Sequence, residues 1–314
     1  MATAPVLLIV FNRPDRVRRL VESLRPHAPE CIRVAVDGPR QSHPSDAAAV
    51  SATLNELGAI DWTSDVTIHT HSENLGISAA IPWAISWVLQ EFEHAIIIEE
   101  DVTVGPNFLA FATAALIHWA PQHDVYSISG YNMVPPSHIT QSECPVRYSR
   151  LVHSYAWATW RRAWEHYDPS MQWFAQQSTR DLAKLLGTRW AALRWKQFAA
   201  HVRRGRVNTW DYQWAMSIWS QNGKSVMPHN NLISYNGQTE GTHTFRSRSW
   251  SELAVGDMDL AQLASLEPGA PVDAQADSFA QRYGQRATPI GVALGYLEAP
   301  AMFVLQWWKR LKRQ

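Results

Sequence analysis

The sequence has few cysteines and no excess of charge of either sign. Only Cys31 and Cys144 occur among its 314 residues, which excludes a scaffold built on disulfides. A single bridge stays open, but a reduced, cytoplasmic setting is the simpler interpretation. Lysine plus arginine and aspartate plus glutamate number 28 each. Because no overall field would attract a polyanion, we expect no nucleic-acid partner.

Long hydrophobic runs are also missing. No stretch reaches the roughly 18 uninterrupted apolar residues that a membrane span needs. The opening MATAPVLLIVFNRP has no charged segment ahead of its apolar run, which predicts a core strand and no signal peptide. Hydrophobic residues make up 46% of the chain and charged residues 18%, so a sizeable buried core is expected.

Apolar strand patterns alternate with amphipathic helix patterns in the first hundred residues. Strands are expected at 5–11, 31–36, 65–70 and 94–99, and helices from about residue 15, over 47–57 and over 77–92. This alternation predicts an α/β fold with a mostly parallel sheet flanked by helices. Ligands of such sheets bind beyond the carboxyl ends of the strands, where Asn12, Asp37 and the acids at 99–101 fall.

The pattern is less regular after residue 125. Helices are expected over 179–204 and 208–223. Trp157, Trp160 and Trp164 follow a helical spacing, which marks a core more often than a site. Residues 246–290 are polar with scattered proline and glycine, as in an extended arm. We therefore divide the chain into a domain over 1–245 and a C-terminal extension over 246–314.

The stretch IIIEEDVTVGPNFL crowds three carboxylates, Glu99, Glu100 and Asp101, behind a run of isoleucines. Like charges at this spacing repel one another, so a positive partner is expected. Oxygen ligands at the end of a buried strand suit a hard divalent cation that bridges a phosphate. The alternative is that two of the acids are solvated and the third caps a turn, because runs of charge are usually solvated.

Eight stretches, in order, resemble bacterial glycosyltransferases of the GT-A fold and, more distantly, animal N-acetylglucosaminyltransferase I. They are FNRPDRVRRL, VDGPR, NLGISAAIPWAISWVL, IIIEEDVTVGPNFL, YSISGYN, SYAWATWRRAWEHYD, TWDYQW and NLISYNGQTEGTHT. Each is weak alone, but together they span residues 5 to about 245. The resemblance implies a GT-A type nucleotide-sugar-binding fold, a nucleotide-sugar donor and a divalent metal, usually Mn²⁺, with Mg²⁺ as the alternative.

This resemblance also implies roles for the three acids. Asp101 would bind the metal that bridges the diphosphate, Glu100 would approach the ribose, and Glu99 would approach the donor sugar. The family commonly has aspartate where this chain has Glu100.

Four further donor-site residues follow from the same resemblance. Asp37 would bond the nucleotide base, Arg13 would lie near the phosphates, Asn74 would sit in a loop lining the donor site, and His243 would lie near the metal and pyrophosphate. Structural alternatives stay open for each. Asp37 could be a turn residue, Arg13 a surface side chain, Asn74 a helix cap and His243 a structural histidine.

Asp211 in NTWDYQW resembles the tryptophan-flanked acid that is the general base of the animal enzyme, with the spacing changed by one residue. The resemblance implies transfer with inversion, in which one carboxylate takes the proton of the acceptor hydroxyl. The alternative is an acid in the first turn of a helix, stabilised by the helix dipole. The base would then be Glu165, Asp168 or Glu240.

Together these features predict a metal-dependent, inverting glycosyltransferase. It would move a sugar from a nucleotide-sugar donor to a saccharide or lipid-linked saccharide acceptor in bacterial surface glycan assembly. One alternative is an inactive relative that binds carbohydrate or nucleotide. Another is a sugar nucleotidyltransferase, which would need a glycine-rich phosphate loop after the first strand, where FNRPDR has no glycine.

The last residues, AMFVLQWWKRLKRQ, place apolar and aromatic side chains ahead of four basic ones. This pattern predicts an amphipathic helix on an anionic membrane surface, and so a peripheral location on the inner face of the membrane. The alternative is a helix docked on the protein's own surface.

Overall fold

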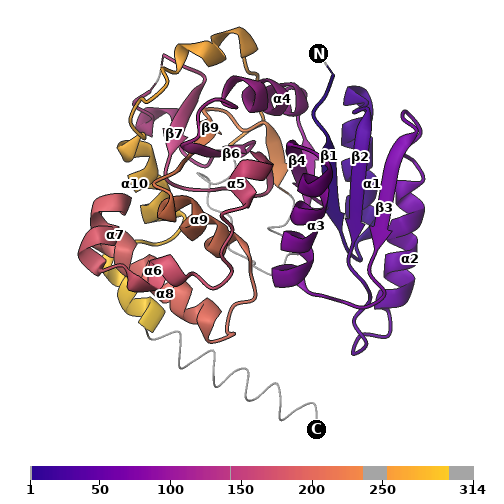
Figure 1. The fold of residues 1–314 in the computed structure, drawn as a ribbon, viewed down its shortest axis with the longest axis horizontal. Helices are drawn as coiled ribbons and strands as arrows, with labels where there is room; N and C mark the ends of the chain where they lie inside the picture. Colours follow the sequence, from indigo (N-terminus) through magenta and orange to yellow (C-terminus); the bar gives the residue numbers. More distant parts are fainter. Residues whose placement is uncertain (1, 142, 236–252, 297–314) are drawn as a thin grey trace.

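An eight-stranded mixed sheet forms the centre of the computed structural model, which describes residues 2–141, 143–235 and 253–296 (Figure 1). The strand order is β3-β2-β1-β4-β8-β6-β9-β7. Within the described chain six of these strands share one direction, and β8 and β7 run against their neighbours. The strands are β1 Val6–Val10, β2 Cys31–Val36, β3 Asp65–Thr70, β4 His94–Glu99, β6 Val125–Ser129, β7 Val146–Ser149, β8 Ala156–Trp160 and β9 Lys224–Pro228. The predicted fold class, a mostly parallel sheet flanked by helices, is confirmed.

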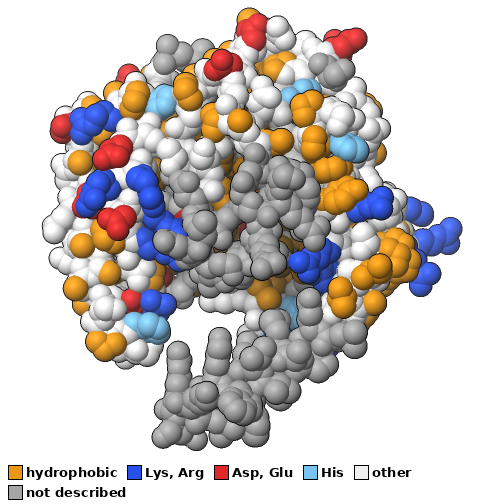
Figure 2. All heavy atoms as spheres, turned by 180° about the vertical axis from the view of Figure 1, so that it is seen from behind, with side chains coloured by type: hydrophobic (Ala, Val, Ile, Leu, Met, Phe, Trp, Pro, Cys, Tyr) orange, Lys and Arg blue, Asp and Glu red, His pale blue; other side chains and the backbone are white. Residues whose placement is uncertain are grey.

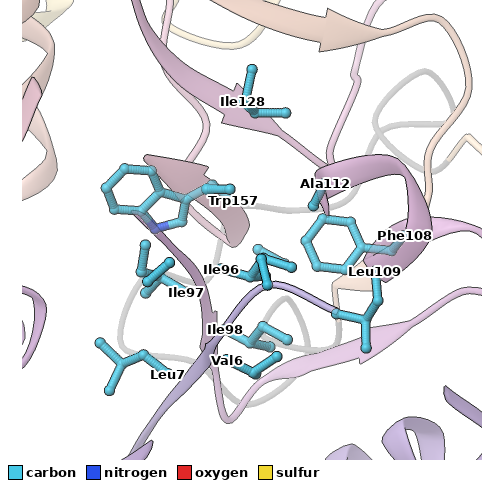
Figure 3. Close-up of a cluster of buried hydrophobic side chains, with 14 of the residues drawn as sticks. Val6, Leu7, Ile96, Ile97, Ile98, Phe108, Leu109, Ala112, Ile128 and Trp157 are labelled. Atoms are coloured by element: carbon cyan, nitrogen blue, oxygen red, sulfur yellow. The ribbon is translucent and has the colours of Figure 1, made fainter. Parts of the chain in front are cut away.

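Strand β4 is apolar on both sides because both faces of the sheet are covered. Successive side chains of a strand point to opposite faces. Figure 3 shows Ile97 on the side of Trp157 and Ile96 on the side of Phe108. All three isoleucines of β4 are fully buried. The covering helices are α1 Pro14–Leu24, α2 Asp46–Leu57, α3 Ile77–Glu91, α4 Phe108–His118 and α5 Arg161–Trp164.

Helix α1 matters for the site because it begins at the end of β1. Pro14 occupies its first turn, where proline loses no hydrogen bond. Val17, Leu20, Val21 and Leu24 recur at the spacing of one helix face and are buried. This packing fixes the start of α1, and with it the side chains of residues 13 and 16.

A second hydrophobic cluster fills the other half of the molecule. It joins α6 Gln172–Gln176, α7 Thr179–Leu186, α8 Arg189–Arg203, α9 Asp211–Ser220 and α10 Ala274–Tyr283. The stretch expected to be helical over 179–204 is helical, with a break at residues 187–188. It is two helices, because Gly187 takes a left-handed conformation (φ 84°) that ends α7.

Two sequence expectations need correction. Trp157 and Trp160 belong to strand β8 and only Trp164 to a helix, although all three are buried as core residues. The extended arm expected over 246–290 contains α10, whose first turn is capped by Asp273 through a hydrogen bond from the Ala276 amide. The buried apolar residues of α10 are alanines, which give only a weak apolar stripe. The sequence pattern therefore did not predict this helix.

The C-terminal extension is in contact with the rest of the protein. Asp277 on α10 lies 3.5 Å from Arg147 of β7, and both side chains are buried. Asp277 also accepts hydrogen bonds from the Ser149 hydroxyl and the Arg150 amide. The division of the chain at residue 245 stays a prediction, and the terminal stretch 301–314 lies outside the described residues.

The cysteines and the hydropathy of the helices bear on two further predictions. Cys31 and Cys144 are both free thiols. In the part of the chain that the structure describes, no helix has the length and apolar character needed to cross a membrane.

Candidate functional site

The three acids follow the carboxyl end of β4, beside the end of β1. Glu99 is the last residue of β4 and stands opposite Ile9. The amide of Glu100 donates to the Ile9 carbonyl (3.1 Å), and its carboxylate accepts from the amide of Phe11 (2.7 Å). Glu100 is therefore buried and tied to the end of β1, and this holds the start of the acid cluster in place.

Helix α1 supplies the positive charge that the acids require. Arg13 Nε lies 3.7 Å from Glu100 Oε1, and Arg16 Nη1 lies 3.7 Å from Asp101 Oδ2. These distances are those of ion pairs and are too long for hydrogen bonds. The side chain of Arg16 is only 5% exposed. Arg16 was not predicted, although its position three residues after Arg13 puts both on one helix face.

A short two-stranded antiparallel sheet holds Asp101 from a second direction. Strand β5, Val102–Val104, pairs antiparallel with β10, Ile233–Tyr235, so Tyr235 stands opposite Val102. The Tyr235 hydroxyl donates a hydrogen bond to Asp101. Asp101 Oδ1 is nevertheless buried without a hydrogen-bond partner among the described residues. A buried, unmatched carboxylate oxygen is costly unless a ligand meets it.

Burial raises the pKa of each of the three acids, and repulsion from neighbouring carboxylates adds to it for Glu99 and Glu100. Burial is the largest cause for Glu99, whose pKa lies well above the ordinary range, and the charges of Asp101, Asp211 and Glu100 add to it. Burial raises the pKa of Glu100 to about 7, against the opposing effects of the Phe11 amide and Arg13. The pKa of Asp101 is also raised by burial, although Arg16 and Arg13 lower it. Arg13 and Arg16 therefore only partly offset the cost of burying these carboxylates.

Asp211 reaches the same cluster from a distant part of the chain. It is the first residue of α9, and the Thr209 hydroxyl donates a hydrogen bond to its carboxylate. Trp210, next to it, stacks on Trp157 of β8 with ring centroids 5.7 Å apart. The charge of Asp211 raises the pKa of Glu99, so the structure brings the predicted base and the predicted donor-side acids together.

The substitute bases differ in their surroundings. The Asp168 carboxylate accepts hydrogen bonds from the amides of Ser170 and Gln172 and so organises the turn before α6. Glu165 is exposed. Glu240 lies outside the described residues, as does His243, and the metal role of His243 stays a prediction.

Tyrosines line the space next to these acids, and they were not predicted. Tyr155 stacks against Tyr235 with centroids 4.2 Å apart, and it meets Tyr131 edge-on at 5.0 Å. Burial raises the pKa of Tyr155 far above its usual value, and the charges of Asp211 and Asp101 raise it further. The Tyr155 phenol therefore stays neutral and keeps its proton near these two carboxylates. No local sequence pattern marks Tyr155, because its partners come from three separate segments.

Asp37 fastens the end of β2 to the loop before α3. Its carboxylate accepts hydrogen bonds from the amides of Gly38 (2.9 Å), Leu75 (2.8 Å) and Gly76 (3.0 Å), and from Asn74 Nδ2 (2.8 Å). Asn74 also donates to the Gly38 carbonyl and does not cap α3, whose N-cap is Gly76. Contact of Asp37 or Asn74 with a nucleotide stays a prediction.

A second group of hydrogen bonds connects the segments that follow β1 and β2. Buried Asp46 accepts hydrogen bonds from Asn12 Nδ2 (2.9 Å) and from Arg40 Nε (2.5 Å) and Nη2 (2.9 Å). The guanidinium of Arg40 lies 5.3 Å from the ring centre of Phe11. Arg40 holds the pKa of Asp46 well below its usual range. Sequence reasoning missed this group, because its members are 34 residues apart.

The residues present fit a divalent cation held partly by a substrate. The described residues contain no group of three side chains able to hold a metal alone. Hard cations such as Mg²⁺ are commonly held by one or two carboxylates together with substrate phosphates. Asp101, with its unmatched buried oxygen, is the side chain best suited to that role.

Comparisons with known proteins give little beyond this geometry. No model of a known protein family matches the chain, and no curated protein sequence matches it. Among solved structures, the chain is similar to UDP-glucose pyrophosphorylase complexed with UDP-glucose, with 9% sequence identity and a TM-score of 0.32 over 71% of this chain and 90% of that chain. A similarity this distant supports no statement about function.

Proposed function

We propose that the chain is a metal-dependent glycosyltransferase that moves a sugar, with inversion, from a nucleotide-sugar donor to a saccharide or lipid-linked saccharide acceptor. One observation carries the proposal. Three acids follow the carboxyl end of β4, and Asp211, an acid from an element more than a hundred residues later, lies close enough for its charge to raise the pKa of Glu99. Such a cluster has the parts needed for a donor side and an acceptor side of one reaction.

On the donor side, Asp101 is the proposed metal ligand. A divalent cation bound there would neutralise the charge that builds on a leaving diphosphate. Arg13, a third exposed at the start of α1, is suited to a phosphate oxygen. Glu99 and Glu100 would accept hydrogen bonds from hydroxyls of the donor sugar and ribose. The raised pKa values of these acids would fall once positive charge is bound beside them.

On the acceptor side, Asp211 is the proposed general base. Its hydrogen bond from Thr209 and the stacking of Trp210 on Trp157 fix the start of α9. A fixed carboxylate can take the proton of an acceptor hydroxyl as that oxygen attacks the anomeric carbon. Attack from the side opposite the leaving diphosphate inverts the configuration. Assembly of bacterial surface glycans is the proposed setting.

The test is an assay of metal-dependent turnover across UDP-, GDP- and dTDP-sugars, with and without a chelator. We expect hydrolysis or transfer from one nucleotide class, lost on chelation. Formation of nucleoside triphosphate from a nucleotide-sugar and pyrophosphate would instead identify a sugar nucleotidyltransferase. Tight binding of a nucleotide-sugar without turnover against any acceptor would identify an inactive relative.

A further inference from the structure

Residues 179–206 carry strongly one-sided charge. They include eight basic residues and one acidic residue, a net charge of +7 in a chain whose overall net charge is zero. This stretch comprises α7, α8 and the turns beside them. Charge of one sign gathered on one pair of helices is an electrostatic feature that attracts an anionic partner.

A cavity of about 590 Å³ between α7 and α8 is lined by three of these cations, Arg180, Lys184 and Arg189. All three are exposed. Lys184 lies 3.9 Å from Asp181, but both side chains are more than half exposed, so this pair is weak. Among the described residues, neither Arg180 nor Arg189 forms an ion pair. The charge of this cavity is therefore available to a partner.

Exposed apolar side chains lie on α8 itself and on the segment that packs against it. Residues 289–296 are helical and pack on α8, where Gln197 Nε2 donates to the carbonyl of Val292 (2.8 Å). The outer side of this segment exposes Ile290 (73%), Leu294 (43%) and Tyr296 (62%), and Trp190 at the start of α8 is 39% exposed. Figure 2 shows Lys and Arg side chains projecting beside hydrophobic ones at the edge of the molecule where Figure 1 places α7 and α8.

We propose that this face, defined here as the basic-apolar face (Arg180, Lys184, Arg189, Trp190, Ile290, Leu294 and Tyr296), docks on a lipid bilayer that carries anionic headgroups. Cations beside aliphatic and aromatic side chains match the boundary between headgroups and acyl chains. Nucleic acid would use the cations but gain nothing from exposed isoleucine and leucine. A second copy of the chain would bring two equally charged faces together.

The sequence that follows Tyr296 is also basic. Residues 299–314 contain Lys309, Arg310, Lys312 and Arg313 and no acid. The proposal concerns the folded face itself and does not depend on the proposed enzymatic function or on the terminal residues.

Co-sedimentation of the full chain with vesicles tests the proposal. We expect binding to vesicles that mix phosphatidylglycerol with phosphatidylcholine, weak binding to pure phosphatidylcholine, and weakening by salt. Arg180→Glu and Lys184→Glu should each lower the partition coefficient at least about fivefold, because each basic residue near an anionic surface contributes about that factor. Arg19→Glu is the matched control. Arg19 is an exposed residue of α1, and its reversal should change binding less than about twofold.

A second variant separates a bilayer from other anionic partners. Ile290→Gln with Leu294→Gln keeps the charge and should lower vesicle binding at least about tenfold, because apolar contacts with the acyl boundary are lost. Circular dichroism and thermal melting confirm that each variant folds. Undiminished vesicle binding in both the charge and apolar variants would overturn the proposal, as would equal binding to anionic and neutral vesicles. So would binding to duplex DNA that the Gln variant keeps, or a dimer that the charge variants dissociate.

Discussion

Asp101 combines a raised pKa with a buried carboxylate oxygen that has no hydrogen-bond partner among the described residues. These features cost stability in the metal-free protein, because burial raises the pKa of Asp101 even though Arg16 and Arg13 act against it. A bound cation would offset that cost. A residue that costs stability in the metal-free protein is therefore the one best suited to bind a ligand.

Replacing Asp101 with asparagine should abolish metal-dependent nucleotide binding without harming the fold. The amide keeps the shape but removes the charge, so Mn²⁺-dependent affinity for a nucleoside diphosphate should fall at least about 100-fold. Thermal stability with chelator present should be unchanged or higher. Calorimetry with UDP and GDP measures the first effect. Asp15→Asn, an exposed acid on α1, is the control, and unchanged affinity in Asp101→Asn would remove the metal role.

The Asp211→Asn variant should keep donor and metal affinity but lose turnover. Removal of a positioned base typically costs about 10²-fold or more, and the Thr209 hydroxyl can still donate to the asparagine carbonyl, so the local structure should persist. Rates from a coupled assay and product configuration by NMR provide the check. Near-normal turnover, or a product that retains the donor's configuration, would contradict the assignment.

Glu100 should make the metal-free protein less stable as pH rises. Its folded pKa of about 7 exceeds the usual value near 4.3, so the folded state holds this proton more tightly. The resulting stability is present below pH 4 and is lost as pH rises through 7. The loss is about 4 kcal/mol for a shift of this size.

This effect must be measured as a difference from Glu100→Gln. Half-buried histidines such as His153 and His229 have lowered pKa values, and they stabilise the fold as pH rises through 6.5, which is the opposite direction. Urea unfolding with chelator at pH 5.5 and pH 8 should show wild type losing stability relative to Glu100→Gln. A constant difference between the two proteins would show that Glu100 does not titrate in this range.

At the scale of elements, local patterns predicted the first half of the sheet well. Strands β1 to β4 alternate with helices whose apolar spacing is clear, and the three acids fall where β4 ends. Tertiary contacts decided the rest. Trp157 sits in a strand because β8 pairs with β4 and β6, although its spacing from Trp160 and Trp164 fits a helix. Tyr235 and Arg16 reach Asp101 only after folding, so no local pattern could pair them with it.

The contact between α10 and β7 should depend strongly on Asp277. Asp277→Ala would remove the partner of buried Arg147 and the acceptor for Ser149 and Arg150. Breaking a buried pair in this way typically costs about 3–5 kcal/mol. Glu93→Ala, which removes an exposed pair with Arg161 (2.7 Å), should cost less than about 1 kcal/mol. Urea unfolding of both variants measures the contrast, and similar losses would show that the α10 contact is dispensable.

At the scale of the whole molecule, the core consists of two hydrophobic clusters, and the first contains more residues than the second. The first surrounds β1 and β4, while the second draws Ala276, Ala280 and Ala287 from the C-terminal extension. The extension therefore contributes to the core of the body it follows. The predicted boundary at residue 245 describes a change in composition, and it crosses these contacts.

A chain that ends at residue 245 should consequently fold poorly, whereas one that ends at Tyr296 should fold normally. The shorter chain lacks α10 and leaves Arg147 buried without Asp277. We expect a broad or absent melting transition for it, and for the longer chain a melting temperature within a few degrees of the full protein. Scanning calorimetry decides between them. A sharp, unshifted transition in the 1–245 chain would establish that it folds alone.

The position of β8 also has a consequence for the protein during its synthesis. Strand β4 ends at Glu99, but its neighbour β8 begins only at Ala156, so roughly 55 residues must be added before that edge is covered, about 3 to 11 s at typical rates. Throughout this interval the nascent chain presents an open strand edge rich in isoleucine, which is prone to pair with other chains. Fragments released from the ribosome between these two strands are therefore expected to aggregate.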